Sequence, residues 1–332
     1  MKPVLMGSLT LSLALVLTGV SKADQDRPVH TYSIVARDTD TGEMGVAVQS
    51  HWFSVGAVVT WAEAGIGAVA TQSFAEPAYG PRGLELMKSG LGAKEALDAL
   101  LSVDPGEAVR QVAFVDASGA IAVHTGSKCI EFASHQTGEE YSVQANMMLT
   151  DRVVPAMAQA YESTKGNLAD RLLAALKAAQ AEGGDIRGRQ SAAMLIVKDR
   201  ATGNPYTDRV LEIRIEDHET PVLELERLLQ LHRAYEHMNQ GDIAVEKGRM
   251  QRAEEHYRAA ERMAPGNPEM TYWHAVTLAT NGNVDASIPL FREVFQADAH
   301  WIELTRRLHK PGVIPDTPEG NALVEEIIRK AK

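Results

Sequence analysis

The hydrophobic and polar positions at residues 31–50 predict two strands joined by a tight turn. An apolar run at 34–36 leads into a polar cluster that ends in Gly42, and apolar residues then alternate along the second strand. Alternation of this kind is typical of a strand, and polar residues followed by glycine suit a tight turn. The resulting hairpin places Thr31, at its start, at the same end as Ser50, at its close.

The pattern over the rest of the first 218 residues predicts strands interrupted by two pairs of helices. Strands are expected at 55–61, 66–71, 111–115, 120–124, 141–146, 192–197 and 209–215, and helices at 84–90, 96–101, 153–161 and 168–181. Hairpin connections dominate, so the sheets should be largely antiparallel. Two sheets with helices on both outer faces would form a four-layer α/β/β/α sandwich, and a simpler α+β fold is also compatible with the pattern.

The pattern changes after about residue 218, and 223–332 shows helical periodicity with polar faces. An internal repeat of 34 residues relates Gly248 to Gly282 and Tyr257 to Phe291. Period and packing positions resemble about two tetratricopeptide repeats with a terminal helix. We therefore expect a sandwich domain at 24–218 and a tetratricopeptide-like domain at 223–332, the alternative being a helical bundle with coincidental spacing.

The first residues have the features of a secretory signal. Lys2 supplies a positive start, the stretch 4–16 is mostly apolar, and Ser21 and Ala23 are the small residues of a cleavage site. The sequence predicts a signal peptide at 1–23, export to the periplasm or beyond, and no stable membrane insertion after cleavage. An uncleaved membrane anchor is the alternative.

Composition excludes several functional classes. The net charge of −11 and the aromatic content of 5% argue against nucleic-acid binding, which needs a basic face and stacking rings. Cys129 is the single cysteine, so no intramolecular disulfide can form. The histidines lack the spacing of a zinc pair, and neither a phosphate-binding loop nor a Gly-x-Ser-x-Gly motif occurs. We expect neither a metal nor a cofactor.

Polar residues at strand ends are the candidates for chemistry, because such ends can converge on one rim of a layered sheet. The predicted catalytic residues are Thr31, Ser50, Gln144, Asn146 and Ser191, and the predicted binding residues are His51, Arg82, His124 and Arg189. A hydroxyl needs a base, and the free α-amine of Thr31, with a pKa of about 8, can act as one. Amides of Gln144 or Asn146 could stabilise an oxyanion. Taken alone, the residues favour the structural alternative, in which each is a satisfied polar group and Thr31 is an ordinary strand residue.

Five segments in combination resemble one known family. They are TYSIVARDTDTGEMGVAVQS, GAVATQSFAEPAYGPRGLELM, AVHTGSKCIEF, YSVQANMML and GGDIRGRQSAAMLIV, within residues 31–215. Together they resemble the domain of unknown function 1028 family, which is assigned to the N-terminal nucleophile (Ntn) hydrolase superfold. The resemblance implies the α/β/β/α sandwich and an amide-bond hydrolase with Thr31 as nucleophile, acting on a small-molecule or peptide-like amide.

The sequence departs from that family in two ways. Residues 24–30 precede Thr31 even after signal cleavage, so a second cut between His30 and Thr31 is needed to free its amine. No lysine occurs between Lys22 and Lys88, which argues against a proteasome-type site. Arg37, His51 or Arg82 could supply positive charge instead. A second hypothesis is therefore an inactive scaffold that binds a protein partner through 223–332, and assembly into a homo-oligomer is left open.

Overall fold

The computed structural model describes residues 31–332, which contain ten strands and twelve α-helices. The strands are β1 (Thr31–Arg37), β2 (Met44–Ser50), β3 (Thr60–Glu63), β4 (Gly67–Ser73), β5 (Arg110–Asp116), β6 (Ile121–Thr125), β7 (Ser134–Gly138), β8 (Tyr141–Ala145), β9 (Ser191–Val197) and β10 (Arg209–Ile215). The helices are α1 (Gly56–Val59), α2 (Tyr79–Lys88), α3 (Ala93–Leu101), α4 (Val153–Ser163), α5 (Leu168–Ala181), α6 (Pro205–Asp208), α7 (Pro221–Glu246), α8 (Met250–Met263), α9 (Pro268–Thr280), α10 (Val284–Ala297), α11 (His300–Arg307) and α12 (Pro318–Ala331).

The strands form two antiparallel sheets. One sheet has six strands in the order β10-β9-β2-β1-β8-β7, and the other has four in the order β3-β4-β5-β6. The predicted hairpin is present as β1 and β2, and its register pairs Thr31 with Ser50. The predictions of a mixed α+β fold and of antiparallel sheets are confirmed.

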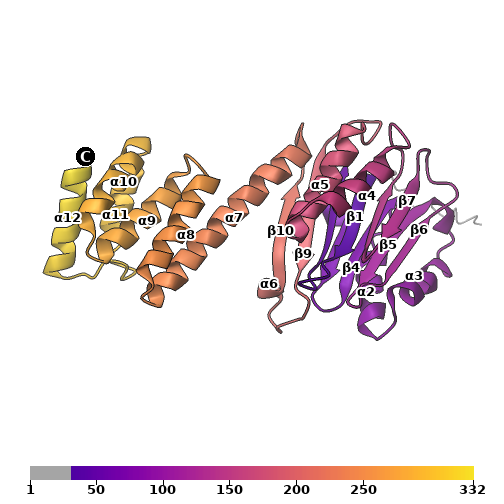
Figure 1. Ribbon diagram of the computed structural model, residues 1–332, viewed down its shortest axis with the longest axis horizontal. Coiled ribbons are helices and arrows are strands. Elements are labelled where there is room, and N and C mark those ends of the chain that lie inside the picture. The colour runs from indigo at the N-terminus through magenta and orange to yellow at the C-terminus, as the bar shows by residue number, and fades with distance from the viewer. Residues whose placement is uncertain (1–30) are drawn as a thin grey trace, which may run out of the picture.

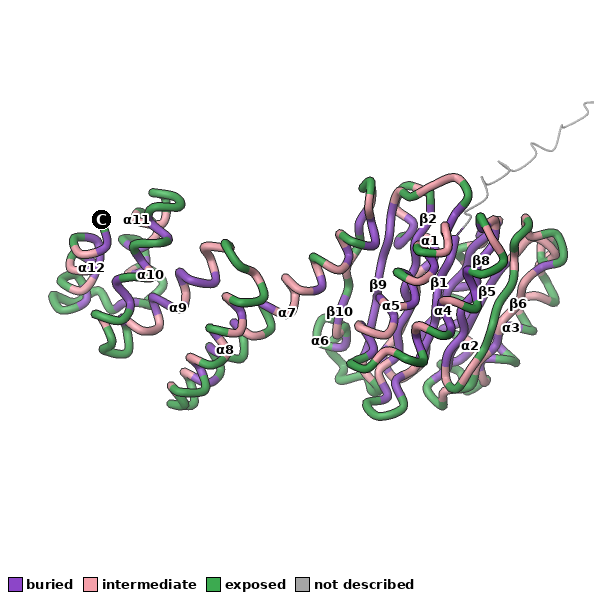
Figure 2. The backbone as a smooth tube through the Cα atoms, turned by 45° about the horizontal axis from the view of Figure 1, so that its top comes forward, coloured by how far each residue is buried: buried purple, intermediate pink, exposed green. Residues whose placement is uncertain are grey.

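The sheets pack face to face, and helices cover their outer faces (Figure 1). Apolar residues between the sheets, among them Val35, Val48 and Ala113, form one core. A second core lies between the six-stranded sheet and α4 and α5, and a third between the four-stranded sheet and α2 and α3. Both faces of the central strands are therefore buried (Figure 2), as expected for a sheet enclosed by other layers.

The strand predicted at 55–61 is only partly correct. Residues 56–59 form the short helix α1, and the strand begins at Thr60. Ser54 has a φ of 56°, and the Val55 N–H donates to Ser191 Oγ at 3.1 Å. A side chain on Gly56 would come within 2.6 Å of the Ala193 side chain. The contact with β9 thus forces a helical turn on an apolar segment whose sequence favours an extended strand.

Two other elements differ from the sequence prediction. The strand β7 was not predicted, because its sequence SHQTG has no apolar alternation, and in the structure it pairs with β8. The helix α2 starts at Tyr79, five residues before the helix predicted at 84–90. Pro81 lies in the first turn of that helix, where its missing N–H costs no hydrogen bond.

The region after residue 220 is helical, and α7 connects it to the sheets. The N-terminal part of α7 packs on β9 and β10, and α7 also packs on α8 in an extended array (Figure 1). The bounds of α10 lie 34 residues after those of α8, and α9 ends 34 residues after α7. Gly248 and Gly282 have positive φ at equivalent turns, and Tyr257 and Phe291 are equivalent fully buried rings. The 34-residue sequence period is thus matched by a structural one.

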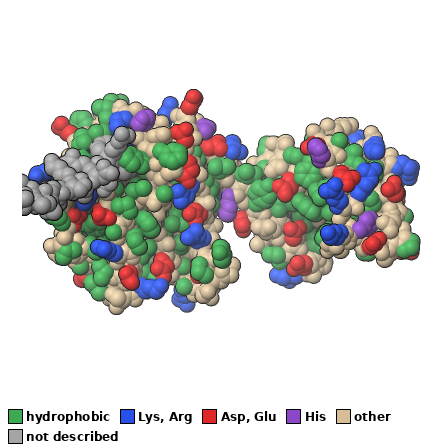
Figure 3. Space-filling view, turned by 180° about the vertical axis from the view of Figure 1, so that it is seen from behind, with side chains coloured by type: hydrophobic (Ala, Val, Ile, Leu, Met, Phe, Trp, Pro, Cys, Tyr) green, Lys and Arg blue, Asp and Glu red, His purple; other side chains and the backbone are tan. Residues whose placement is uncertain are grey.

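The surface carries both signs of charge. Acidic and basic side chains are interspersed over both ends of the molecule in the view from behind (Figure 3). No helix within residues 31–332 is long and apolar enough to cross a membrane. The predicted signal peptide and its cleavage site lie outside the described residues.

Candidate functional site

One end of the space between the two sheets is polar. Alternate positions of each strand face this space, and at one end they are hydroxyl or amide residues that are all 0% exposed: Thr31, Ser33, Ser50, Gln72, Gln111, Ser142, Gln144, Asn146 and Ser191. We call this set the inter-sheet polar cluster. Thr31 pairs in register with Ser50, and Ser50 with Ser191, so three hydroxyl residues form a row across β1, β2 and β9. Buried polar groups gathered in this way need hydrogen bonds, and their partners define the site.

The backbone of Thr31 is held by amides from three directions. Its carbonyl oxygen accepts hydrogen bonds from the Asn146 N–H at 3.1 Å, from Asn146 Nδ2 at 3.4 Å and from Gln72 Nε2 at 3.3 Å. Asn146 and Gln72 belong to different sheets, so Thr31 lies where both sheets contact each other. Its position in the fold is therefore tightly determined.

Gln111 on β5 connects these amides. Its Oε1 accepts from Gln72 Nε2 at 2.8 Å and from Asn146 Nδ2 at 2.9 Å. Its Nε2 lies 2.9 Å from Thr125 Oγ1 and 3.0 Å from the Ala145 carbonyl. Both amide atoms of Gln111 are thus bonded, and a buried network of this kind favours one arrangement of its members.

Two of the predicted catalytic residues have structural partners. Gln144 Nε2 donates to Ser33 Oγ at 2.6 Å, and its Oε1 accepts from Ser142 Oγ at 2.9 Å. Ser191 Oγ donates to the Trp52 carbonyl and holds the turn that leads into α1. Thr31, Ser50 and Asn146 lie together, because Thr31 pairs in register with Ser50 and its carbonyl accepts from Asn146 Nδ2.

The structure separates the four predicted binding residues. His51 and Arg189 line one cavity of about 510 Å³, next to the row of hydroxyls. Arg82 lines a different cavity on the outer side of the four-stranded sheet. His124 Nε2 lies 2.8 Å from the Glu107 carbonyl, on the face of β6 opposite to Thr125.

Two functional candidates, Gln111 and Asp185, were missed at the sequence level as single residues. Gln72 stands among the polar residues at the predicted strand ends, but Gln111 has no spacing that distinguishes it from an ordinary strand residue. The Asp185 side chain is fully buried, forms an ion pair with Arg187 at 2.8 Å and accepts from the His51 N–H at 3.1 Å. Asp185 and Arg187 belong to the segment GGDIRGRQ, so the resemblance to a family was the available signal for them.

Backbone strain and unpaired buried groups occur next to the cluster. Ser73 follows Gln72 with a φ of 70°, and Met147 follows Asn146 with a φ of 56°. Within the described part of the chain both amide atoms of Gln49 lack a hydrogen-bond partner, and so does Gln72 Oε1. Positive φ at non-glycine residues and unpaired buried groups gather at functional sites, because elsewhere they only cost stability.

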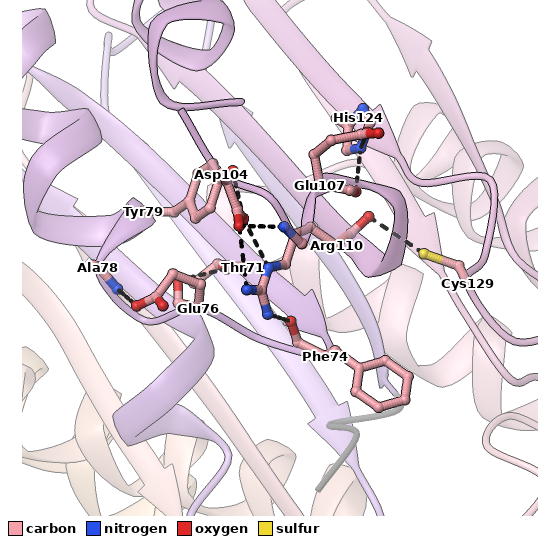
Figure 4. Close-up of polar contacts among 11 residues, drawn as sticks. Thr71, Phe74, Glu76, Ala78, Tyr79, Asp104, Glu107, Arg110, His124 and Cys129 are labelled. Carbon is pink, nitrogen blue, oxygen red and sulfur yellow. Dashed lines mark hydrogen bonds and ion pairs between the residues drawn. The ribbon is translucent and has the colours of Figure 1, made fainter. Parts of the chain in front are cut away.

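An ion pair holds the loop that follows β4. Asp104 Oδ2 accepts from Arg110 Nε at 2.9 Å and from the Tyr79 hydroxyl at 3.1 Å, and the Arg110 guanidinium also donates to the Phe74 carbonyl (Figure 4). Cys129 Sγ donates to the Arg110 carbonyl at 3.3 Å, and burial raises the pKa of its thiol. Cys129 is thus a structural residue and a poor candidate for a nucleophile.

Replacing Asp104 with Asn is expected to lower the free energy of unfolding by about 2 kcal/mol at pH 7, because the carboxylate bonds a charged partner. Burial alone would raise the pKa of Asp104, but hydrogen bonds from Arg110 and the Gly106 N–H outweigh it and lower the pKa. The carboxylate therefore stabilises the fold above its unfolded pKa of about 4, and this is lost as pH falls through the lower folded pKa.

Urea unfolding of the Asp104→Asn variant at pH 7 and pH 3 measures this effect, with Asp98→Asn as control. Asp98 forms an exposed pair with Lys94, so its loss should change stability by less than about 0.5 kcal/mol. The difference between wild type and Asp104→Asn should shrink at pH 3. If wild type and Asp104→Asn differed in stability by the same amount at pH 3 and pH 7, the stabilising role assigned to the Asp104 carboxylate would be contradicted.

The described residues contain no group of three or more His, Cys, Asp or Glu side chains placed to hold a metal ion. The candidate site consists of hydroxyl and amide groups, with the Asp185–Arg187 ion pair at its border. Its centre is Thr31.

A search of curated proteins finds no match. A crystal structure of a Silicibacter pomeroyi protein under the DUF1028 family model shares 30% identity, covers 60% of this chain and 88% of its own, and gives a TM-score of 0.54. Anbu, an ancestral beta-subunit from Yersinia bercovieri, shares 10% identity over 60% of this chain and 93% of its own. Its TM-score of 0.33 is too low to show a common fold.

The family model described as a family of unknown function (DUF1028) matches residues 31–225. The match starts at Thr31, the first residue of β1, and ends within α7. It covers more than half of the sequence, and it includes both sheets. The chain belongs to the DUF1028 family.

Proposed function

We propose that this protein is an exported Ntn-type amidohydrolase on an α/β/β/α sandwich, with Thr31 as its nucleophile. The observation that supports it most is the place of Thr31, at the first position of β1, within the inter-sheet polar cluster and opposite Ser50. A cut between His30 and Thr31 would turn the amide nitrogen of Thr31 into a free amine at the end of a central strand.

Amide hydrolysis would then use only groups at the end of the sheets where Thr31 lies. The α-amine takes the proton of Thr31 Oγ, and the oxygen adds to the substrate carbonyl. As the tetrahedral intermediate collapses, the α-ammonium returns the proton to the leaving nitrogen, so the amine departs and an ester remains on Thr31, which water hydrolyses. Paired residues of adjacent strands have Cβ atoms about 5 Å apart, so Ser50 Oγ can reach the same carbonyl.

Access to Thr31 requires a change in the chain. Thr31 is 0% exposed, so a substrate can reach it only after a neighbouring segment moves or is removed. Cleavage after His30 is a change of that kind, and it supplies the base as well. Processing is therefore the step on which the proposal depends.

The mature protein is expected to begin at Thr31. Intact mass and N-terminal sequencing of the exported protein measure this directly. A chain that begins stably at Asp24 and still hydrolyses an amide at a normal rate would rule out the amine of Thr31 as the base.

A second candidate is an inactive scaffold whose helices bind a protein partner, and the 34-residue structural period after residue 220 favours it. Equivalent helices with equivalent buried rings are the arrangement of tetratricopeptide-like repeats, which commonly bind peptides. A protein that begins at Thr31, is folded, and hydrolyses no member of a broad amide library would favour the scaffold over the enzyme.

A further inference from the structure

Two cavities adjoin at the junction between the six-stranded sheet and α7. The larger has a volume of about 510 Å³, within the range of small-molecule sites, and the smaller about 230 Å³. Arg189 and Thr220 line both, so the two cavities meet at these residues, and we treat them as two parts of one groove. We call it the Arg189 groove.

Arg189 supplies a positive charge that has no partner in residues 31–332. Its neighbours differ: Arg187 pairs with Asp185 at 2.8 Å, and Lys177, which lines the smaller cavity, pairs with Glu226 at 2.9 Å. Arg189 forms neither an ion pair nor a hydrogen bond with a described residue, and it is exposed. An exposed planar guanidinium without such a partner can bind a carboxylate through two parallel hydrogen bonds.

The larger cavity adds a second donor. His218 Nδ1 accepts from the Thr220 N–H at 3.0 Å, so the ring proton of a neutral His218 lies on Nε2. Two carboxylates, Asp217 and Glu219, also line this cavity, and Gln190 Nε2 donates to Asp217 at 3.1 Å. This part of the groove can therefore bind both donors and acceptors of a peptide backbone.

The smaller cavity combines positive charge with an apolar wall. Ala181, Val222 and Leu223 line it, the last with 55% of its surface exposed. No carboxylate of the described residues lines it. A ligand group placed here meets aliphatic surface on one side and Arg189 on the other.

We propose that the Arg189 groove binds the C-terminal end of a short peptide whose last residue is aliphatic. The terminal carboxylate pairs with Arg189, and the aliphatic side chain packs on Val222 and Leu223. The bound peptide is the substrate of Thr31 only if the proposed function holds, and in that respect the inference rests on it.

The distance between groove and nucleophile indicates the length of the peptide. His51 and Gln190 of the larger cavity directly adjoin Ser50 and Ser191 of the hydroxyl row. The strand β9 is the second neighbour of β1, and adjacent strands lie about 4.8 Å apart, so the groove is about 10 Å from Thr31. An extended chain advances about 3.3 Å per residue, which places the cut amide about three residues before the carboxylate.

Binding is tested without hydrolysis in full-length protein carrying Thr31→Ala. The probes are N-acetyl-Ala-Ala-Leu as the free acid and as its C-terminal amide, titrated by calorimetry. The free acid is expected to bind at least about ten-fold more tightly, because a charge-assisted pair replaces a neutral contact. Arg189→Ala should remove that preference. Arg200→Ala should keep it, because Arg200 is 90% exposed and lines neither cavity.

The outcomes of these titrations test peptide binding by the Arg189 groove separately from hydrolysis at Thr31. Equal affinity for acid and amide, a preference that survives Arg189→Ala, or no binding of either peptide would overturn the inference. Leu223→Asp gives a second measurement, and it should weaken binding of the free acid more than binding of its amide. Because no hydrolysis is needed, a protein that binds as expected but never cleaves an amide would refute only the proposed function.

Discussion

Replacing Thr31 with Ala is expected to lower kcat/KM for amide hydrolysis by about 10³-fold or more, because the variant has no nucleophilic oxygen. Folding should be little affected. The hydrogen bonds to Thr31 from Gln72 and Asn146 go to its carbonyl, and Ala keeps that carbonyl. Thr31→Ser keeps the hydroxyl as well and should retain most of the activity. The measurement is steady-state hydrolysis of a peptide amide by protein that begins at residue 31.

Ser33→Ala is the matched control for this variant. Ser33 lies on the same face of β1, is equally buried, and accepts from Gln144 Nε2 at 2.6 Å. Its loss should lower stability while kcat/KM changes only slightly. If Thr31→Ala stayed active, or if both variants lost activity in parallel with stability, Thr31 would be a structural residue of the sheet.

The hairpin at 31–50 shows what the sequence could predict. Alternation and turn chemistry act between near neighbours, so they determine both strands and place Thr31 opposite Ser50. The helical region was predictable for the same reason, since a 34-residue period repeats local packing positions such as Tyr257 and Phe291.

The partners of the candidate residues were not predictable. Gln144 and Ser33 lie 111 positions apart in the chain, and Gln72 and Gln111 lie 39 apart. Such pairs depend on how two sheets face each other, and no periodicity within one strand contains that information. For this reason Gln144 was predicted as an oxyanion donor, whereas in the structure its amide bonds Ser33.

The strand prediction at 55–61 was wrong over residues 56–59 for a related reason. Its apolar residues predict a strand, but the contact of Gly56 with Ala193 and the bond of Val55 to Ser191 require a helical turn. Tertiary contacts here outweigh local propensity. The polar strand β7 is the converse case, in which pairing with β8 replaces the missing apolar pattern.

Replacing Gln111 with Leu is expected to lower the free energy of unfolding by about 3–4 kcal/mol, because several buried polar groups lose their partner at once. Leu has a similar volume, so no cavity is created. The amides of Gln72 and Asn146 would lose the acceptor that Gln111 Oε1 provides at 2.8 and 2.9 Å, and the Ala145 carbonyl would lose a donor. Urea unfolding at pH 7 measures the loss. Gln136→Leu, on the exposed strand β7, should change stability by less than about 0.5 kcal/mol.

The same variant separates the two roles of the inter-sheet polar cluster. Gln111 Oε1 accepts from Gln72 and Asn146, and the amides of these two residues hold the Thr31 carbonyl. If this arrangement matters for catalysis, kcat should fall in folded Gln111→Leu protein, while affinity of the Arg189 groove for the peptide acid stays the same. A loss of stability below about 1 kcal/mol would mean that water replaces the missing amide, and the cluster would then be open to solvent and to a substrate from the side of β5.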